Sequence, residues 1–395
     1  MKQLVPLVLA FLIISCKNKT LKQDFISQQN LHEKTYSSSS LTKEQEWDSL
    51  NQVSDRIVIH KKRKLKKNYR TFGWHLYSNG STYKNYNFSL LWGISYFTYK
   101  IIPETGNYKN IHQWKTTALI DSAQANNCKV FLSVSNFGSK DNSVFLSSAK
   151  SQETLTNNLI ALLAYRNANG INIDFEGVAK KDKQKLAQFI TSLSKKLKKA
   201  NPEYMVSLCL YGIDWNNIFD INTLNSSIDF YTLMGYDYYG SFSKIAGPVS
   251  PLQNSRTFGK GLEASVQHYL NKGVQNKNLI IGLPYYGAEW DTYSNKIPSK
   301  VKRFRSHPPY KNIQRIYIDS LKSNVLFDPE SSSSYITIKN SDNSYKEIWF
   351  ENKKSLAIKY DWIKTNHLGG VGIWALGYDD GYSELWNLLS EKFSE

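Results

Sequence analysis

Hydrophobic and polar positions follow two periods along most of this chain. Short apolar runs rich in Val, Ile, Tyr and Phe predict strands at residues 71–74, 93–99, 129–135, 170–175, 205–211, 229–234, 279–284 and 370–374. Stretches with a helical period separate most of these runs. The clearest is 179–202, where one face carries Leu186, Phe189, Ile190, Leu193 and Leu197. Strands that alternate with helices predict an α/β fold with a parallel sheet.

The eight predicted strands fit a (β/α)8 TIM barrel that occupies residues 69–395. The helical pattern fails at about residues 291–348, and short β-like pieces such as SYITIKN predict a small insertion there, between strand 7 and strand 8. An open doubly wound sheet is the competing architecture. It is disfavoured because no glycine-rich phosphate loop follows the first strand and nothing matches GxxxxGK[ST].

The first residues, MKQLVPLVLAFLIISC, predict a lipoprotein signal peptide at residues 1–15, followed by lipidation of Cys16. The apolar run is too short to span a bilayer comfortably, and a small residue precedes the Cys. A cleaved signal peptide with a chance Cys is the alternative. Both interpretations predict an exported protein. The first predicts a membrane-anchored lipoprotein of a bacterial cell envelope, periplasmic or at the cell surface, with the leaflet open.

Residues 16–68 are polar and basic and predict a tether, with a helix around residues 42–54. The net charge is +17, and up to Arg70 there are 14 Lys and Arg against 6 Asp and Glu, a surplus of +8. This surplus fits either attraction to an anionic surface or a solvated tether that holds the body away from a membrane, and we favour the tether. Nucleic-acid binding is disfavoured because the chain is exported and shows no recognisable nucleic-acid module.

After processing, Cys128 and Cys209 remain, and we expect buried, reduced thiols, although a bridge between them stays open. No Cys or His spacing indicates a zinc site, so no metal and no cofactor are expected.

The candidate chemistry lies in GINIDFEGV, residues 170–178. In a strand Asn172, Asp174 and Glu176 share one face, with successive members roughly 6.6 Å apart. At the carboxyl end of a barrel strand this face opens on the cleft where active sites of such barrels lie. Two neighbouring carboxylates push their pKa values apart, and one can stay protonated near neutral pH as a general acid. A buried ion-pair network with a lysine explains the same pattern equally well.

The stretch resembles the DGxDxDxE signature of glycoside hydrolase family 18, the chitinase family. LMGYDYYG at 233–240 is similar to the Met-x-Tyr-Asp motif of that family's sixth strand, and FLSVSNFG at 131–138 loosely resembles its third-strand Ser-x-Gly-Gly. GGVGIWALGYDD at 369–380 places a tryptophan at the end of the eighth strand. The form GxNIDFE, together with residues 345–374, is similar to the branch that includes spore-cortex and chitobiase-like N-acetylglucosaminidases.

The resemblance implies retaining, substrate-assisted hydrolysis of β-linked N-acetylglucosamine glycans, with chitin and chitooligosaccharides ahead of peptidoglycan and N-glycans. Glu176 matches the acid that protonates the glycosidic oxygen. Asp174 matches the carboxylate that orients the attacking N-acetyl group. The substrate-binding residues it implies hold the acetamide or form an apolar floor: Tyr236, Asp237, Met234 and Trp374.

This chain departs from the signature at Asn169 and Asn172, where the family pattern has Asp, and at Ser135-Asn136 in place of Gly-Gly. Asn172 can donate a hydrogen bond to Asp174 but cannot exchange a proton with it. This substitution keeps a second function open, a chitinase-like lectin with weak or no hydrolysis. An envelope scaffold whose anchor and tether matter more than any pocket is a third interpretation.

Further aromatic side chains near predicted strand ends are candidate sugar platforms or plain packing residues: Trp74, Tyr211, Trp215, Tyr239, Tyr286 and Trp290. Of these, Trp74 and Tyr286 join Asn172 in the predicted substrate-binding set. The expected partners are an N-acetylglucosamine-containing glycan and, through the lipid anchor, a membrane. We expect no nucleic-acid partner and a monomer.

Overall fold

The chain closes into a barrel, and the predicted (β/α)8 fold is confirmed. The computed structural model describes residues 26–53 and 62–395, so the predicted signal peptide and Cys16 lie outside the described residues. Eight parallel strands form the barrel in the order β1-β13-β7-β6-β5-β4-β3-β2. Each lies where its apolar run predicts a strand: β1 (Arg70–Leu76), β2 (Gly93–Lys100), β3 (Lys129–Phe137), β4 (Gly170–Glu176), β5 (Met205–Tyr211), β6 (Phe230–Met234), β7 (Leu279–Pro284) and β13 (Gly370–Leu376).

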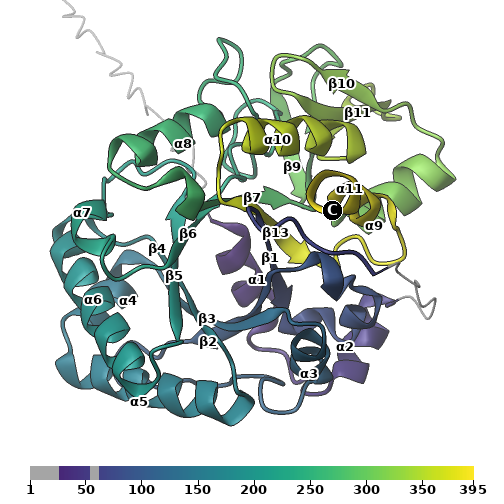
Figure 1. The fold of residues 1–395 in the computed structure, drawn as a ribbon. Helices are drawn as coiled ribbons and strands as arrows, with labels where there is room; N and C mark the ends of the chain where they lie inside the picture. Colours follow the sequence, from purple (N-terminus) through teal and green to yellow (C-terminus); the bar gives the residue numbers. More distant parts are fainter. Residues whose placement is uncertain (1–25, 54–61) are drawn as a thin grey trace, which may run out of the picture.

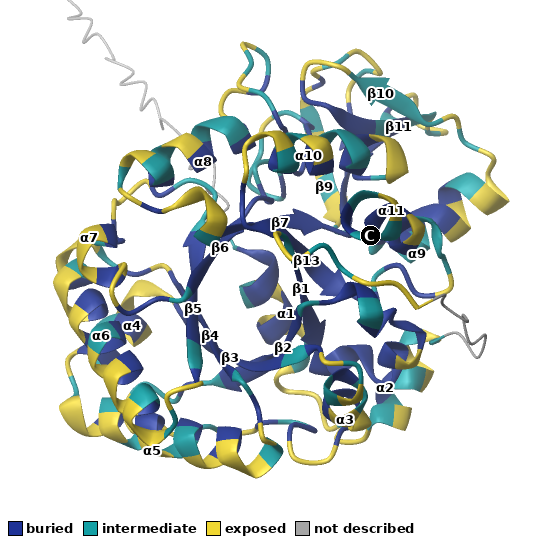
Figure 2. Ribbon diagram, in the orientation of Figure 1, coloured by how far each residue is buried: buried dark blue, intermediate teal, exposed yellow. Residues whose placement is uncertain are grey.

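Helices surround the ring of strands, and their outer faces are exposed while the strands are buried (Figures 1 and 2). They are α3 (Ala118–Ala125), α4 (Ser139–Leu146), α5 (Ala149–Arg166), α6 (Lys183–Ala200), α7 (Ile221–Leu224), α8 (Leu262–Asn271), α10 (Lys353–Thr365) and α11 (Glu384–Phe393). The apolar face predicted for 179–202 is buried on α6, where Phe189 stacks on Phe175 of β4 with ring centroids 5.7 Å apart. Phe175 therefore anchors β4 to the helical layer, and the alternate side chains of β4 face the barrel interior.

A second, antiparallel sheet interrupts the barrel between β7 and β13, as predicted. Its order is β10-β11-β12-β8-β9. The strands are β8 (Gly287–Thr292), β9 (Val301–Ser306), β10 (Leu326–Asp328), β11 (Ser333–Lys339) and β12 (Tyr345–Phe350). The short helix α9 (Tyr310–Asn312) and a π-helical segment (Ile313–Ser320) lie between β9 and β10. A fully buried ion pair between Lys359 of α10 and Glu351, 2.6 Å apart, ties this sheet to the barrel.

In the described part of residues 26–69, two helices precede the barrel: α1 (Gln28–Tyr36) and α2 (Glu44–Asn51). α2 lies within the helix expected around 42–54, and its Trp47 is 1% exposed between Tyr36 and Tyr77. In the view of Figure 1, α1 projects inside the ring of barrel strands. The sequence pattern indicated only a polar tether here, whereas this described part of residues 16–68 packs on the barrel.

Cys128 and Cys209 are free and buried, as expected. Among the described residues, no helix combines the length and the apolar composition that crossing a membrane requires.

Candidate active site

The paired carboxylates of β4 lie at its carboxyl end, inside the mouth of the barrel. Asp174 is 2% exposed and Glu176 is 7% exposed. Gly177 follows with φ +70°, and a Cβ at this position would lie 3.2 Å from Gly138 Cα. The Glu176 carbonyl oxygen accepts hydrogen bonds from the Gly138 amide (2.9 Å) and from Asn142 Nδ2 (2.7 Å). This tight turn, which favours glycine, fixes the strand end that carries both carboxyl groups.

The two carboxyl groups have raised pKa values for a clear physical reason. Burial raises the pKa of Asp174 to about 7. Burial and then the neighbouring Asp174 charge raise the pKa of Glu176 well above its ordinary value, while a hydrogen bond with the Ser27 side chain opposes the shift. One atom of each group, Asp174 Oδ1 and Glu176 Oε1, has no hydrogen-bond partner within the described part of the chain. The site can therefore hold a proton on Glu176 near neutral pH and has acceptors to spare for a ligand.

Asn172 lies one step deeper on the same face of β4 and is fully buried. Its Oδ1 accepts a hydrogen bond from Trp74 Nε1 at 2.8 Å, and Cys209 Sγ lies 3.3 Å from the same oxygen. Its Nδ2 donates to Ser207 Oγ at 2.8 Å. Among the described residues the Asn172 side-chain amide thus donates to Ser207 of β5. The sequence had suggested a hydrogen bond from this amide to Asp174 instead.

A second group of side chains faces the carboxylates from the end of β6. Tyr286 donates a hydrogen bond to Asp237 Oδ1 at 2.5 Å. Asp237 has φ +59°, a left-handed conformation that Asp tolerates better than most residues, and burial raises its pKa to about 7. The rings of Tyr236 and Tyr286 lie 6.1 Å apart, and Met234 ends the same strand. Phenol, carboxyl and thioether groups from the segments after β6 and β7 therefore gather in one polar cluster beside the carboxylates.

Trp374, which the family resemblance predicts as an apolar floor, lies beside this cluster. It is fully buried, and its ring centroid lies 5.8 Å from that of Trp74 and 6.3 Å from that of Tyr236. The structure thus brings together all nine predicted catalytic and substrate-binding residues: Glu176, Asp174, Tyr236, Asp237, Met234, Trp374, Asn172, Trp74 and Tyr286. Cys16, predicted to carry the lipid, lies outside the described residues.

Comparison with known proteins settles the family. The family model of glycosyl hydrolases family 18 matches residues 73–379. This chain belongs to that family. Among its relatives, the uncharacterized glycosylase YvbX of Bacillus subtilis (strain 168) is 26% identical over 237 residues, which cover 59% of this chain and 64% of that protein. The cortical fragment-lytic enzyme of Bacillus anthracis is 24% identical over 272 residues, which cover 66% of this chain and 57% of that protein.

The chain therefore spans less than two thirds of the length of these two curated relatives. Among solved structures, the glycoside hydrolase family 18 N-acetylglucosaminidase from Paenibacillus barengoltzii aligns with a TM-score of 0.71 at 17% sequence identity. The alignment covers 82% of this chain and 99% of that structure, a likeness of fold.

The other candidate aromatic side chains of this family 18 chain differ in their surroundings. Tyr211 and Tyr239 donate their hydroxyl hydrogens to the backbone oxygens of Phe175 and Phe258, and the Trp290 ring nitrogen donates to the Gly240 oxygen. Their polar atoms are used within the protein, which favours packing. Trp215 is 80% exposed, with Lys260 Nζ 5.8 Å from its ring centroid.

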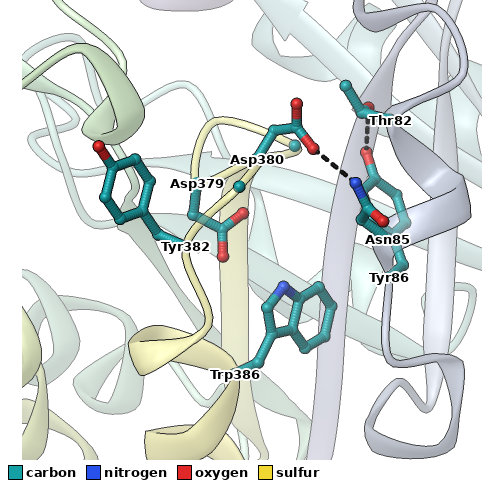
Figure 3. A pocket seen from close by; sticks show the side chains of 9 residues that line it. Thr82, Asn85, Tyr86, Asp379, Asp380, Tyr382 and Trp386 are labelled. Carbon is teal, nitrogen blue, oxygen red and sulfur yellow. Dashed lines mark hydrogen bonds between the residues drawn. The ribbon is translucent and has the colours of Figure 1, made fainter. Parts of the chain in front are cut away.

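A separate small cavity follows β13, and Asp379 and Asp380 are among its lining residues (Figure 3). Its volume of about 10 Å³ has room for at most one water molecule, so it is no site for a sugar. In the two described stretches of the chain, no group of three or more His, Cys, Asp or Glu side chains is placed to hold a metal ion.

The sequence did not indicate that α1 contacts this site. The backbone amide of Gln28 donates a hydrogen bond to Asp237 Oδ2 at 3.0 Å. The side-chain nitrogen of Gln29, Nε2, lies 2.6 Å from the Tyr236 hydroxyl and 3.2 Å from Met234 Sδ. Ser27 is a typical N-cap and could have marked the start of a helix. No sequence signal could show where that helix docks, because its buried residues are polar.

Proposed function

We propose that this protein is a retaining glycosidase that hydrolyses β-linked N-acetylglucosamine glycans with the help of the substrate's own acetamide group. The observation that carries the proposal is the pair of buried carboxyl groups on β4. Burial raises the pKa of both groups, the Asp174 charge raises that of Glu176 further, and Asp174 lies two residues deeper on the same face. A general acid beside a second carboxylate is the arrangement that glycosidic cleavage requires.

In the proposed first step, Glu176 donates its proton to the glycosidic oxygen, and the bond from this oxygen to the anomeric carbon breaks. The carbonyl oxygen of the substrate's acetamide attacks the anomeric carbon and forms an oxazolinium ion, whose positive charge the Asp174 carboxylate stabilises. In the second step, Glu176 takes a proton from water, and the water oxygen attacks the anomeric carbon. The bond from this carbon to the acetamide oxygen breaks, which opens the oxazolinium ring and restores the acetamide. Two displacements at one carbon give retention of configuration.

The pocket at the end of β6 supports an acetamide-bearing sugar. The Tyr236 hydroxyl can donate to an acetamide oxygen, Asp237 can accept from a hydroxyl or amide hydrogen, and Trp374 offers a flat apolar surface for a sugar ring. The names of the relatives agree with this class of substrate, since one acts on N-acetylglucosaminides and another on cortical fragments. Chitooligosaccharides are the proposed first substrates, with peptidoglycan fragments and N-glycans next.

The experiment is product analysis of N-acetylglucosamine tetramer and pentamer by mass spectrometry with detection of the anomer first formed. We expect β-anomeric products from the wild-type chain and none from Glu176→Gln, whose amide has no acidic proton to give. Glu203→Gln makes the same change at an exposed position and serves as the control. Unchanged melting temperatures in both variants would assign the loss to chemistry.

The same assay separates hydrolysis from binding alone. If the wild-type chain and Glu176→Gln both bind the oligomers and neither cleaves them, the protein is a lectin and the proposed hydrolysis is wrong. Asn172 gives this outcome a structural reason, because its amide is bonded to Ser207 and cannot exchange a proton with Asp174 as an Asp could. Cleavage of peptidoglycan fragments alone would keep the mechanism and change the substrate.

We also propose that the protein is a lipoprotein anchored to a cell-envelope membrane through Cys16. The support is the order of residues 1–16, with a lysine, an apolar run, a small residue and then the cysteine.

A further inference from the structure

The helix α1 fills the pocket in which the proposed function places the sugar. Its N-terminal turn carries the contacts: the Ser27 side chain bonds Glu176, the Gln28 amide bonds Asp237, and the Gln29 side chain bonds Tyr236 and Met234. Ser27 and Gln28 are 3% and 7% exposed, and Gln29 is 1% exposed. Four groups proposed to bind or cleave a glycan are therefore already bonded to the protein's own N-terminal segment.

The contact between α1 and the site is incomplete on both sides. On the helix, Gln28 Nε2 and Gln29 Oε1 are buried without a hydrogen-bond partner among the residues described. On the barrel, Asp174 Oδ1, Glu176 Oε1 and Trp374 Nε1 are in the same state. Each buried polar atom without a partner weakens the closed arrangement. A ligand that satisfied these groups would hold the site better than α1 does.

The buried face of α1 is polar, unlike that of a helix that belongs to a core. Its buried residues are Gln28, Gln29, His32 and Glu33. A helix of nine residues is marginally stable without tertiary contacts. α1 therefore depends on its docking, and its buried residues are polar, whereas its last residue, Tyr36, packs on Trp47.

Charged and titratable groups surround α1 on every side. Glu176, Asp237 and Tyr236 contact it from the mouth of the barrel, and Tyr77 and His112 interact with its Glu33. On the helix itself, His32 Nε2 lies 2.7 Å from Ser78 Oγ, and Glu33 lies 3.8 Å from Lys100 Nζ of β2. Apart from Lys100, His32 and His112, which lie near Glu33, this set is acidic or phenolic, so a further negative charge at Gln29 beside Glu176 and Asp237 is repelled.

α2 secures the segment to the rim of the barrel beside the site. Asp48 accepts hydrogen bonds from the Ser81 amide (2.6 Å) and hydroxyl (2.7 Å), and Asn51 Nδ2 donates to the Ser78 oxygen at 2.5 Å. Trp47 supplies the apolar contact. Release of α1 need not release α2, so α1 stays near the mouth and can return.

We propose that residues 26–36 form an intramolecular plug that occupies the glycan-binding pocket and must leave it before a glycan binds. The proposal rests on the proposed function, since it takes the pocket to be the glycan site. The enzyme is then held in a closed state, and glycan binding competes with the plug. Its apparent affinity for glycan is reduced in proportion to the fraction of open molecules.

The test compares two matched variants of the full chain at pH 8. Gln29→Glu places a carboxylate against the acidic site, whereas Asn30→Asp makes the same change one residue along, on the partly exposed side of the helix. Hydrogen exchange of the α1 amides reports the plug directly, and kcat/KM on N-acetylglucosamine tetramer reports access to the site. We expect Gln29→Glu to lower α1 protection and raise kcat/KM by about tenfold or more, and Asn30→Asp to change neither.

A second measurement follows α1 exchange in the wild-type chain as tetramer is added. Loss of α1 protection with bound tetramer supports the plug. Protection of α1 that persists at saturating tetramer while cleavage proceeds overturns the plug and leaves the proposed function intact. If Gln29→Glu releases α1 but the protein neither binds nor cleaves any oligomer, the proposed function is wrong. The proposal that residues 26–36 plug a glycan site is then wrong as well.

Discussion

Replacing Trp47 by Ala tests whether the N-terminal helices dock on the barrel independently of its core. The indole is 1% exposed and packs edge-on against Tyr36 and Tyr77, with ring centroids 5.7 and 5.8 Å away. Removing a buried Trp side chain costs about 3–5 kcal/mol. If the cost falls on docking alone, the ratio of undocked to docked segment rises by about 10²-fold or more.

The assay is hydrogen exchange of α1 and α2 together with thermal unfolding of the whole chain. We expect Trp47→Ala to reduce protection in residues 28–51 by the factor above, while the melting temperature of the barrel changes little. We also expect Trp47→Ala to raise kcat/KM on N-acetylglucosamine tetramer. This increase is smaller than the change in protection, because kcat/KM stops rising once α1 has left the site in every molecule. Leu50→Ala is the control, since this leucine of the same helix is 56% exposed and its loss costs at most about 0.5 kcal/mol.

Two results together would refute the reasoning. Trp47→Ala would lower the melting temperature of the barrel as much as a deletion in its core does, and the hydrogen-exchange protection of α1 would fall together with that of the barrel strands. The segment would then be part of the barrel's core rather than a docked cover.

Three other predictions follow from the same structure. Burial raises the pKa values of Asp174 and Asp237 to about 7, and we expect undocking of α1 to admit water and lower both values by more than the lost Gln28 bond to Asp237 raises one of them, so that the plugged state holds more protons than the open state. Plugging is therefore strongest below pH 7 and weakens as pH rises through 7, which the protection factors of α1 between pH 6 and 8 would show. Glu351→Gln leaves the buried Lys359 charge unpaired and should lower the free energy of unfolding by about 3–5 kcal/mol in urea titration, whereas Glu351→Leu combined with Lys359→Met should restore most of it. Cys16→Ser should move the protein from the membrane fraction to the soluble fraction of the host cell, and an unchanged distribution would count against lipidation at this residue.

The barrel could be predicted from the sequence because its signal is local. Each apolar run is bounded by polar residues, and the runs for β5 and β7 match the observed strands to the residue. The carboxylate pair was predictable for the same reason, since a period of two fixes which side chains share a face. The partner of Asn172 was not, because Ser207 lies on the neighbouring strand and its register is a tertiary property.

The docking of α1 could not be predicted, because its physical basis leaves no periodic trace. Helices that pack on a core carry an apolar stripe, as α6 does. The buried positions of α1 are instead glutamines, a histidine and a glutamate, which bond a polar site. Such a sequence resembles a linker until the site that it fills is known. The same polar composition that lets α1 bond to the acidic site made residues 16–68 look like a tether in the sequence.

Closure of the barrel has a consequence for the order in which the chain can fold. β1 pairs with β13, with Arg70 opposite Gly370, and β13 also pairs with β7. Until β13 has been synthesised, both β1 and β7 present an unpaired edge, and the mouth that holds Asp174 and Glu176 has no fixed shape. Open strand edges invite pairing between chains. A chain whose last strand has not yet joined the barrel is thus the species most exposed to aggregation, and a chaperone that shields it until β13 pairs would raise the yield of native protein.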